Sequence, residues 1–357
     1  MYLMWLSSIE SVGAKSGRLL LNFFGTAGNV YNAGREDLKH AKILSESKID
    51  NIIKSKLKID LGEYTDRLYK LSMSFISINN PLYPDVLKEI ADPPLGLYTI
   101  GKADLLKSPY VIGVVGSRRC SEYGVSTTYR LSKELSQCGI TIISGMAKGI
   151  DKMAHKGALD TDGATIAVLG CGADICYPAE NREIYNLICD KGLVISEHPP
   201  GTKPVPGFFP KRNRIISGIS QAVLVVEAGL KSGSLITADQ ALEQGRDVYA
   251  VPGNINNKLS EGTNNLIKQG ALLISDYTDV LNALGLEKKK EKEENLAKFL
   301  DINERLVYDC MSFEPIGIDV LLSKIDMDLQ KLQYILTMLE LKKYIERLPG
   351  QRYMLNK

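Results

Sequence analysis

The stretch GFFPKRNRIISGISQAVLVVEAGLKSGSLIT, residues 207–237, decides how the rest of the chain is interpreted. It opens with two aromatic residues and then places three cations around Asn213. The apolar run 222–226 follows, and continuous apolar runs of this length are typical of strands buried on both faces of a parallel sheet. A loop of small hydroxyl residues then opens a helix. Cations, flat rings and helix-start amides together favour a ligand that carries phosphates.

Similar apolar runs recur on both sides of this stretch, separated mostly by segments with helical apolar spacing. The runs cover residues 111–115, 141–144, 165–169, 193–196, 222–226 and 248–251. This alternation predicts an α/β fold, an extended Rossmann-like, doubly wound and mostly parallel sheet. Ligands of such sheets bind beyond the carboxyl ends of the strands, so the loops at those ends are the candidate site.

The flanking segments predict two smaller domains. Residues 1–60 are expected to be helical, and residues 8–25 are similar to a helix-hairpin-helix, although Ser11 stands where the turn usually has its first glycine. A plain helical packing module explains the same residues. The other predicted boundaries are 61–286 for the Rossmann-like domain, with linker and edge structure over 61–108, 287–299 for a charged linker, and 300–357 for a C-terminal domain.

The C-terminal domain resembles a winged helix. A helix around 303–311 and a short segment at 316–322 precede a strongly amphipathic helix at 328–341. Two short apolar stretches then flank Pro349-Gly350, which predicts a terminal β-hairpin. Three helices followed by a hairpin are the basis of this assignment.

The bulk composition excludes a global polycation and a membrane span. The net charge is +2, so any nucleic-acid site must be a local patch. No apolar run reaches membrane-spanning length, and the N-terminus lacks the features of a signal peptide. The six cysteines suggest no disulfide framework. We therefore expect a cytoplasmic protein without membrane association.

The loop after the first parallel strand argues against a dinucleotide cofactor. A dinucleotide site needs GxGxxG there, whereas residues 116–119 read GSRR, and the second strand ends without the acid that binds a ribose. An isolated phosphate still suits this loop. The alternative is that Arg118 and Arg119 are surface charges that cap the turn. Asp151, at the end of the next loop, is expected to be a helix N-cap.

A basic groove with interleaved aromatic rings is how proteins hold single-stranded nucleic acid. The alternative places the aromatic rings in the core and leaves the cations solvated. The residues predicted to contact DNA are Gly116, Ser117, Arg118, Arg119, Ser144, Gly145, Lys148, Lys203, Phe209, Lys211, Arg212, Asn213, Arg214, Ser232, Gly233, Ser234 and Thr237.

Catalysis explains the residues less well than binding does. A Walker motif is missing, and none of the three histidines has metal or triad spacing. Carboxylates do not cluster as in a two-metal nuclease, and Cys171 and Cys176 have no second pair for zinc. We therefore predict no catalytic residue, no metal and no cofactor.

Several motifs together resemble the DprA (Smf) family of DNA-processing proteins of bacterial transformation. They are GSRR at 116–119, SGMAKGIDKMAHKGAL at 144–159, GCGADICYPAEN at 170–181, FPKRNRIISGIS at 209–220, VVEAGLKSGSLITADQALEQGRDVYAVPG at 225–253 and GTNNLIKQGA at 262–271. The resemblance is strong over residues 60–285 and looser at both ends.

This resemblance implies a non-enzymatic protein that binds and protects single-stranded DNA. It further implies a homodimer that loads the recombinase RecA onto DNA coated by single-strand-binding protein, with the dimer and RecA contacts within 238–275. The GSR loop and the FPxRNR segment would line the DNA pocket. Lys148 replaces an arginine, which keeps the charge and loses bidentate geometry. The winged helix is open to either duplex DNA or a protein partner.

Two other functions remain as alternatives. A nucleotide phosphoribohydrolase uses a related scaffold, but its PGGxGTxxE motif carries a catalytic glutamate that the loop at 228–239 does not have in that place. A winged-helix transcription regulator would explain the C-terminus and leave the arginines of the core unexplained.

Overall fold

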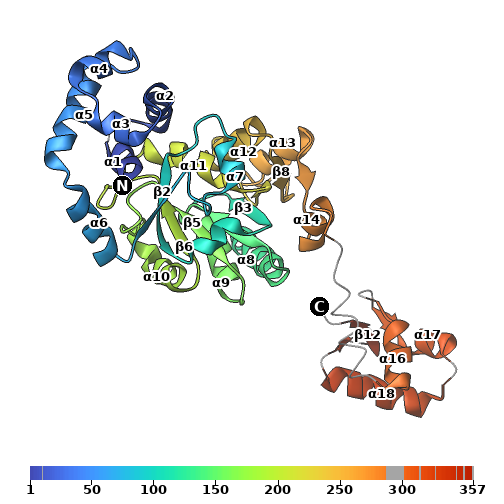
Figure 1. Ribbon diagram of the computed structural model, residues 1–357. Coiled ribbons are helices and arrows are strands. Elements are labelled where there is room, and N and C mark those ends of the chain that lie inside the picture. The colour runs from blue at the N-terminus through green and yellow to red at the C-terminus, as the bar shows by residue number, and fades with distance from the viewer. Residues whose placement is uncertain are drawn as a thin grey trace. The chain divides into compact units, whose positions relative to one another are not determined.

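A computed structural model of the protein describes residues 1–9, 11–286, 301–312, 315–325, 327–342, 344–348 and 350–355. The chain forms two compact units, 1–283 and 284–357, and each is described by itself (Figure 1). The predicted charged linker, 287–299, lies outside the described residues. In the part of the chain that the structure describes, no helix is both long enough and apolar enough to cross a membrane.

The first unit is built on a nine-stranded sheet in the order β1-β2-β6-β5-β4-β3-β7-β8-β9. Its strands are β1 (Ser74–Ser77), β2 (Gly96–Gly101), β3 (Val111–Val115), β4 (Thr141–Ser144), β5 (Thr165–Val168), β6 (Leu193–Ser196), β7 (Ala222–Val225), β8 (Asp247–Ala250) and β9 (Leu272–Leu273). Strands β3 to β9 pair in parallel. The predicted doubly wound, mostly parallel sheet is therefore confirmed, and each of its six predicted strands is present.

Helices cover both faces of the sheet (Figure 1). One face carries α7 (Asp85–Lys88), α11 (Phe208–Ile219) and α12 (Gly233–Glu243), and the other carries α8 (Glu122–Gln137), α9 (Ile150–Leu159) and α10 (Arg182–Lys191). The connections include η1 (Ala103–Lys107), η2 (Ala179–Asn181), α13 (Glu261–Lys268) and α14 (Tyr277–Ala283). Ile215, Ile216 and Ile219 of α11 are buried against the strands, so apolar spacing fixes the side of α11 that faces the sheet.

Two antiparallel strands were missed in the sequence, where residues 61–108 were expected to be linker and edge structure. Strand β1 pairs with β2, and β2 pairs antiparallel with β6, so they extend the parallel sheet at one edge. Leu97 and Tyr98 of β2 are fully buried. Each strand is short and lies near prolines or glycines. The alternation of apolar and polar residues that normally predicts a strand is therefore too brief to recognise.

The N-terminal region packs as helices against this edge. They are α1 (Tyr2–Ser8), α2 (Ala14–Phe24), α3 (Ala27–Asn32), α4 (Arg35–His40), α5 (Glu46–Lys58) and α6 (Leu61–Lys70). Their core centres on Trp5, whose indole N–H donates to Ser55 Oγ at 3.0 Å. Helices α1 and α2 lie on either side of the expected hairpin turn, which fits both the helix-hairpin-helix and the plain helical module. The Tyr64 and Tyr98 hydroxyls, 2.9 Å apart, join α6 to β2.

The second unit has the predicted winged-helix layout. Its elements are α16 (Ile302–Asp309), β10 (Ile316–Gly317), α17 (Ile318–Lys324), α18 (Leu329–Leu341), β11 (Ile345–Leu348) and β12 (Arg352–Leu355). Leu332, Ile335, Leu336 and Leu339 give α18 a buried face. Strands β11 and β12 form the expected hairpin, and β10 pairs with β12 to complete a small sheet.

Candidate nucleic-acid interface

The order of the strands brings the predicted loops to one edge of the sheet. Strand β3 lies between β4 and β7, so the chain reverses its direction of winding at the β3–β7 pair. Such a switch point leaves a crevice at the carboxyl ends of the strands. The loops after β3, β4, β5, β6 and β7 all open at that edge. The predicted site residues lie in these loops, at the end of β4, or in the first turns of α11 and α12.

The loop after β3 is held on both sides by its neighbours. The backbone N–H of Ser117 donates to the Glu227 carbonyl at 2.7 Å, and the Ser117 carbonyl accepts from the Ile150 N–H at 3.2 Å. Gly116 packs so tightly here that a Cβ would lie 2.9 Å from the Glu227 carbonyl oxygen. Arg118 and Arg119 are exposed. A fixed backbone therefore presents two exposed arginine side chains.

The loop after β4 is braced by side chains from two helical segments. Oδ2 of Asp151 accepts from the backbone N–H groups of Gly145 at 3.1 Å and Ala147 at 3.3 Å. Asn181 donates to the Met146 carbonyl at 2.8 Å. Met146 has φ +59°, a left-handed conformation that a non-glycine residue adopts only when its surroundings impose it. The loop is thus rigidly placed.

Asp151 is not the helix N-cap that the sequence predicted. Helix α9 has Gly149 as its N-cap, without a side-chain cap, and Asp151 reaches back to the preceding loop instead. Burial raises the pKa of Asp151, and the nearby charge of Arg212 opposes that rise. Its carboxylate serves the loop backbone, and this role explains its burial without chemistry.

The sequence predicted that Arg212 would contact DNA, but its side chain is buried in the protein interior. Only 3% of it is exposed, and its Nη1 donates to the carbonyls of Gly145, at 2.6 Å, and Val168. Burial lowers its pKa to about 10, and Asp151 counteracts this. A Cβ on Gly145 would lie 2.4 Å from Nη1, so the glycine makes room for the guanidinium. Through its hydrogen bond to the Gly145 carbonyl, Arg212 stabilises the loop after β4 from the protein interior.

Arg214 is also committed to partners inside the protein. Its Nη2 lies 2.7 Å from Glu197 Oε2, and its Nε lies 3.6 Å from Asp92 Oδ2, with 13% of the side chain exposed. Asn213 is half-buried, and its carbonyl accepts from Ser217 Oγ at 3.3 Å. Alternate residues of α11 point to different sides of the helix, which a list of cations in a sequence does not reveal.

Phe209, at the start of α11, is the centre of a stack that joins this helix to two loops. The Tyr177 and Phe209 ring centroids are 5.4 Å apart with an interplanar angle of 31°. The Arg118 guanidinium carbon lies 5.9 Å from the Phe209 centroid. Gly170 backs the Phe209 ring, since a Cβ there would lie 2.9 Å from Cδ1. We call Arg118, Phe209 and Tyr177 the aromatic stack.

Tyr177 was not among the predicted site residues, although 45% of it is exposed. The signal that could have found it is an aromatic residue before Pro178, in a glycine-rich loop at the carboxyl end of a strand. Phe208, the other aromatic residue at the start of α11, stacks instead on His198 with a centroid distance of 4.2 Å. The two neighbouring phenylalanines therefore lie in different surroundings.

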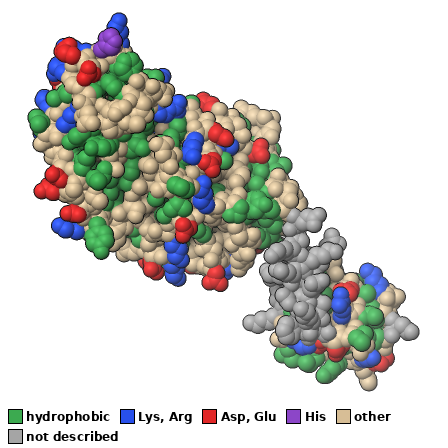
Figure 2. All heavy atoms as spheres, viewed as in Figure 1, with side chains coloured by type: hydrophobic (Ala, Val, Ile, Leu, Met, Phe, Trp, Pro, Cys, Tyr) green, Lys and Arg blue, Asp and Glu red, His purple; other side chains and the backbone are tan. Residues whose placement is uncertain are grey.

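Further cations extend the surface around the stack. Lys148, Lys203 and Lys211 are exposed, and Lys148 pairs with Glu180 at 2.7 Å. The net charge of the whole chain is only +2, and Figure 2 shows acidic and basic side chains intermixed on the face in view. Attraction to a polyanion therefore depends on this local set and not on a general positive field.

The predicted hydroxyl residues mostly serve their own helix. Ser232 is the N-cap of α12 and accepts from the Ser234 N–H at 3.4 Å, and the two Oγ atoms are 2.8 Å apart. Ser234 and Thr237 are buried, whereas Gly233 is exposed. Ser144 likewise donates to the Val114 carbonyl at 2.6 Å. The contacts of the described residues do not join these hydroxyls to the aromatic stack.

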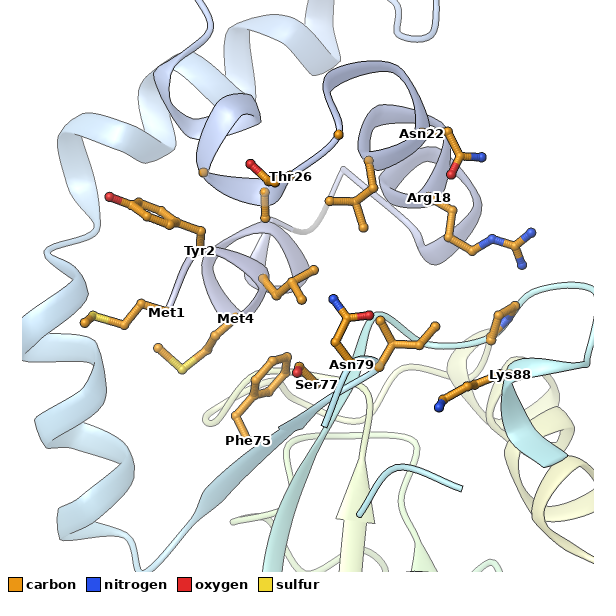
Figure 3. Close-up of a pocket in the computed structure, with 17 residues that line it drawn as sticks. Met1, Tyr2, Met4, Arg18, Asn22, Thr26, Phe75, Ser77, Asn79 and Lys88 are labelled. Atoms are coloured by element: carbon orange, nitrogen blue, oxygen red, sulfur yellow. The ribbon is translucent and has the colours of Figure 1, made fainter. Parts of the chain in front are cut away.

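A sizeable cavity lies elsewhere, between the N-terminal helices and β1. Its volume is about 680 Å³, and Figure 3 shows Arg18 and Lys88 on one side of it and Met1 and Tyr2 on the other. None of the predicted site residues lines it. Within the described ranges, histidine, cysteine and carboxylate side chains do not form a cluster able to hold a metal ion.

Known proteins match this chain over both units. The family model of DNA recombination-mediator protein A matches residues 74–285, and that of the DprA winged helix domain matches residues 291–351. Protein Smf of Synechocystis sp. is 38% identical over 287 residues, which are 80% of this chain and 72% of the relative.

Two solved structures share the fold. DNA processing protein A (DprA) of Streptococcus pneumoniae superposes with a TM-score of 0.68 and 37% identity, covering 79% of this chain and 95% of its own. DNA processing protein A of Helicobacter pylori, whose structure concerns its single-stranded DNA binding mode, gives a TM-score of 0.54 and 32% identity over 59% of this chain and 95% of its own.

Proposed function

Because the chain belongs to the DprA (Smf) family, we propose that it binds single-stranded DNA at the carboxyl edge of its large sheet. The observation that carries this proposal is the aromatic stack, where an exposed guanidinium and two rings, one from a loop and one from α11, meet. A phosphate backbone follows cations while its bases stack on rings, and base stacking tolerates any sequence. We therefore propose binding with little sequence preference.

Each part of the surface takes a distinct role in this proposal. Tyr177 offers its exposed ring to a base, and Phe209 holds that ring in place. Arg118 and Arg119 contact phosphates, and Lys203 and Lys211 extend the path. Glu180 competes with DNA for Lys148, so that lysine contributes only when its ion pair opens.

Arg212 acts in this proposal as a positioning residue. It fixes the carbonyl of Gly145, and through Asp151 and Asn181 the same loop is held in one conformation. A rigid surface loses little conformational entropy on binding, so the buried groups add to affinity without touching DNA. Binding accounts for these residues, and we propose that the protein is not an enzyme.

The family resemblance also supports partners for this activity. We propose that the protein forms a homodimer and loads RecA onto DNA coated by single-strand-binding protein, in the cytoplasm. Strand β9 ends the sheet, and its Leu272 and Leu273 are each 44% exposed. Leu242 of α12, 59% exposed, lines the same cavity as Leu272 at this edge. An apolar edge strand favours association with another chain, which supports the dimer.

The proposal is tested by titrating the full chain against a labelled oligo-dT strand and a duplex of equal length over a salt series. We expect tighter binding of the single strand, with log affinity falling linearly with log salt. Equal affinity for duplex, or affinity independent of salt, would refute it. Adding RecA and single-strand-binding protein tests loading as faster filament growth on the coated strand.

A further inference from the structure

Glu227 is a buried carboxylate at the switch point of the sheet. It follows β7, and only 1% of it is exposed. Its Oε2 accepts from the backbone N–H of Ser121 at 2.8 Å, and its Oε1 accepts from the Ser121 hydroxyl. The end of the loop from β3 to α8 is thus hydrogen-bonded to a carboxylate that follows the neighbouring strand β7.

The carboxylate lies against the first turn of α8. Ser121 is the N-cap of this helix, and its hydroxyl accepts from the Gly124 N–H at 3.2 Å. A Cβ on Gly124 would lie 2.3 Å from Glu227 Oε2, so this turn accommodates the carboxylate only because it has a glycine there. The positive end of α8, a helix of 16 residues, stabilises that charge.

This is the place where a Rossmann-like sheet holds the phosphates of a nucleotide. The pyrophosphate of a dinucleotide sits at the N-terminus of the helix after the first strand, beside the switch point. Here β3 is that strand, β7 is its neighbour across the switch, and α8 is that helix. Glu227 supplies from within the chain an anion where those proteins bind one from solution.

We propose that Glu227 is a built-in substitute for the nucleotide phosphate at the start of α8. It excludes free nucleotides from the crevice, which makes it a specificity-determining residue. It also positions the loop after β3, because its carbonyl accepts from the Ser117 N–H at 2.7 Å while its carboxylate holds Ser121. Both ends of the loop that carries Arg118 are then fixed by one residue; this part rests on the proposed DNA binding.

Anion rescue of Glu227→Ala tests the proposal without any DNA. Removing the carboxylate leaves the Ser121 amide and the helix start without their anion, so the melting temperature falls. We expect inorganic pyrophosphate or formate at millimolar concentration to raise it again. The matched control is Glu122→Ala, which removes an exposed carboxylate from the same first turn of α8. Neither wild type nor this control should respond to the anions.

If Glu227→Ala folds, the change in its melting temperature on adding the anions tests the proposal. Failure of both anions to raise the melting temperature of Glu227→Ala, or an equal rise for wild type, would overturn the proposal even if DNA binding is as proposed. If Glu227→Ala does not fold, Glu227→Gln replaces it, since the amide keeps the shape and an acceptor for Ser121. We expect pyrophosphate to leave the melting temperature of Glu227→Gln unchanged, as in wild type, because the amide still fills the place of the anion. A rise of its melting temperature with pyrophosphate would contradict the proposal.

Discussion

The guanidinium of Arg118 lies over the ring of Phe209, with 5.9 Å between its central carbon and the ring centroid. Arg118 follows β3 and Phe209 opens α11, so the fold brings together a charge and a ring from distant parts of the sequence. A single strand of DNA needs both at once, because phosphates and bases alternate along it. The contact is the reason to expect that changes at Arg118 and at the neighbouring Tyr177 weaken DNA binding.

Replacing Arg118 by alanine should weaken oligo-dT binding by about tenfold, because a phosphate contact and the cation over Phe209 are lost together. The slope of log affinity against log salt should become shallower by about one charge. Fluorescence anisotropy measures both. Arg130→Ala, which removes an exposed arginine from the middle of α8, is the matched control and should leave affinity unchanged. Equal losses in the two variants would mean that only general charge matters.

Tyr177→Ala should lose about 1–3 kcal/mol of binding free energy, the usual cost of removing one base-stacking ring. Tyr177→Phe keeps the ring and should bind as wild type does. Tyr69→Ala removes a tyrosine that is 86% exposed on α6 and serves as the control. If Tyr177→Phe is as weak as Tyr177→Ala, the hydroxyl and not the ring is what binds.

Arg212→Met should destabilise the fold by about 3 kcal/mol, because the carbonyls of Gly145 and Val168 lose their buried donor and Asp151 loses a neighbouring charge. Urea denaturation gives the free energy of unfolding. We expect DNA affinity to fall with it, since the loop after β4 loses its support. A variant of unchanged stability would show that this guanidinium is not structural.

His155 should make the protein sensitive to mild acid. It is fully buried, and burial lowers its pKa from 6.5 to about 3. Below about pH 6.5 the unfolded chain therefore binds a proton that the folded chain does not, and stability is lost down to the folded pKa. From about pH 7 to about pH 5 this loss should be about 2 kcal/mol. Stability curves at the two pH values, compared with His155→Gln, measure it, and an equal decline in both proteins would contradict it.

Leu273→Glu should dissociate the proposed homodimer. It places a charge on the exposed face of the edge strand β9, where desolvation of that charge opposes any apolar contact. Light scattering after size exclusion reports the molar mass. Leu57→Glu, at a leucine that is 88% exposed on α5, is the control and should remain dimeric. Dissociation of both, or of neither, would argue against β9 as the contact.

The parallel strands could be predicted because burial on both faces makes each of them a continuous apolar run. All five residues of β3 are buried, and the sequence VIGVV reflects that directly. Strand β1 carries no such signal, because its residues are only partly buried. It becomes recognisable as a strand only through its pairing with β2, which is known from the structure. The winged helix was predicted from the apolar face of α18 and the turn at its hairpin.

The loops at the carboxyl edge of the sheet could be predicted from the sequence, and the arrangement of their side chains could not. From the sequence, each cation of α11 is equally well placed to contact DNA. In the structure, Arg212 is buried against the loop after β4, and Arg214 pairs with Glu197. Which face of a helix a charge occupies depends on the elements packed around it. Tyr177 was missed for a similar reason, because its value comes from meeting Phe209 across the fold.

The most direct test of the aromatic stack is photocrosslinking of an oligonucleotide that carries 5-bromodeoxyuridine, followed by mass spectrometry of the peptides. A base stacked on the exposed ring is close enough to crosslink. We predict adducts on Tyr177, with fewer in Arg118→Ala. Adducts confined to the winged helix, or to residues around the cavity between the N-terminal helices and β1, would contradict the proposal that DNA binds at the stack.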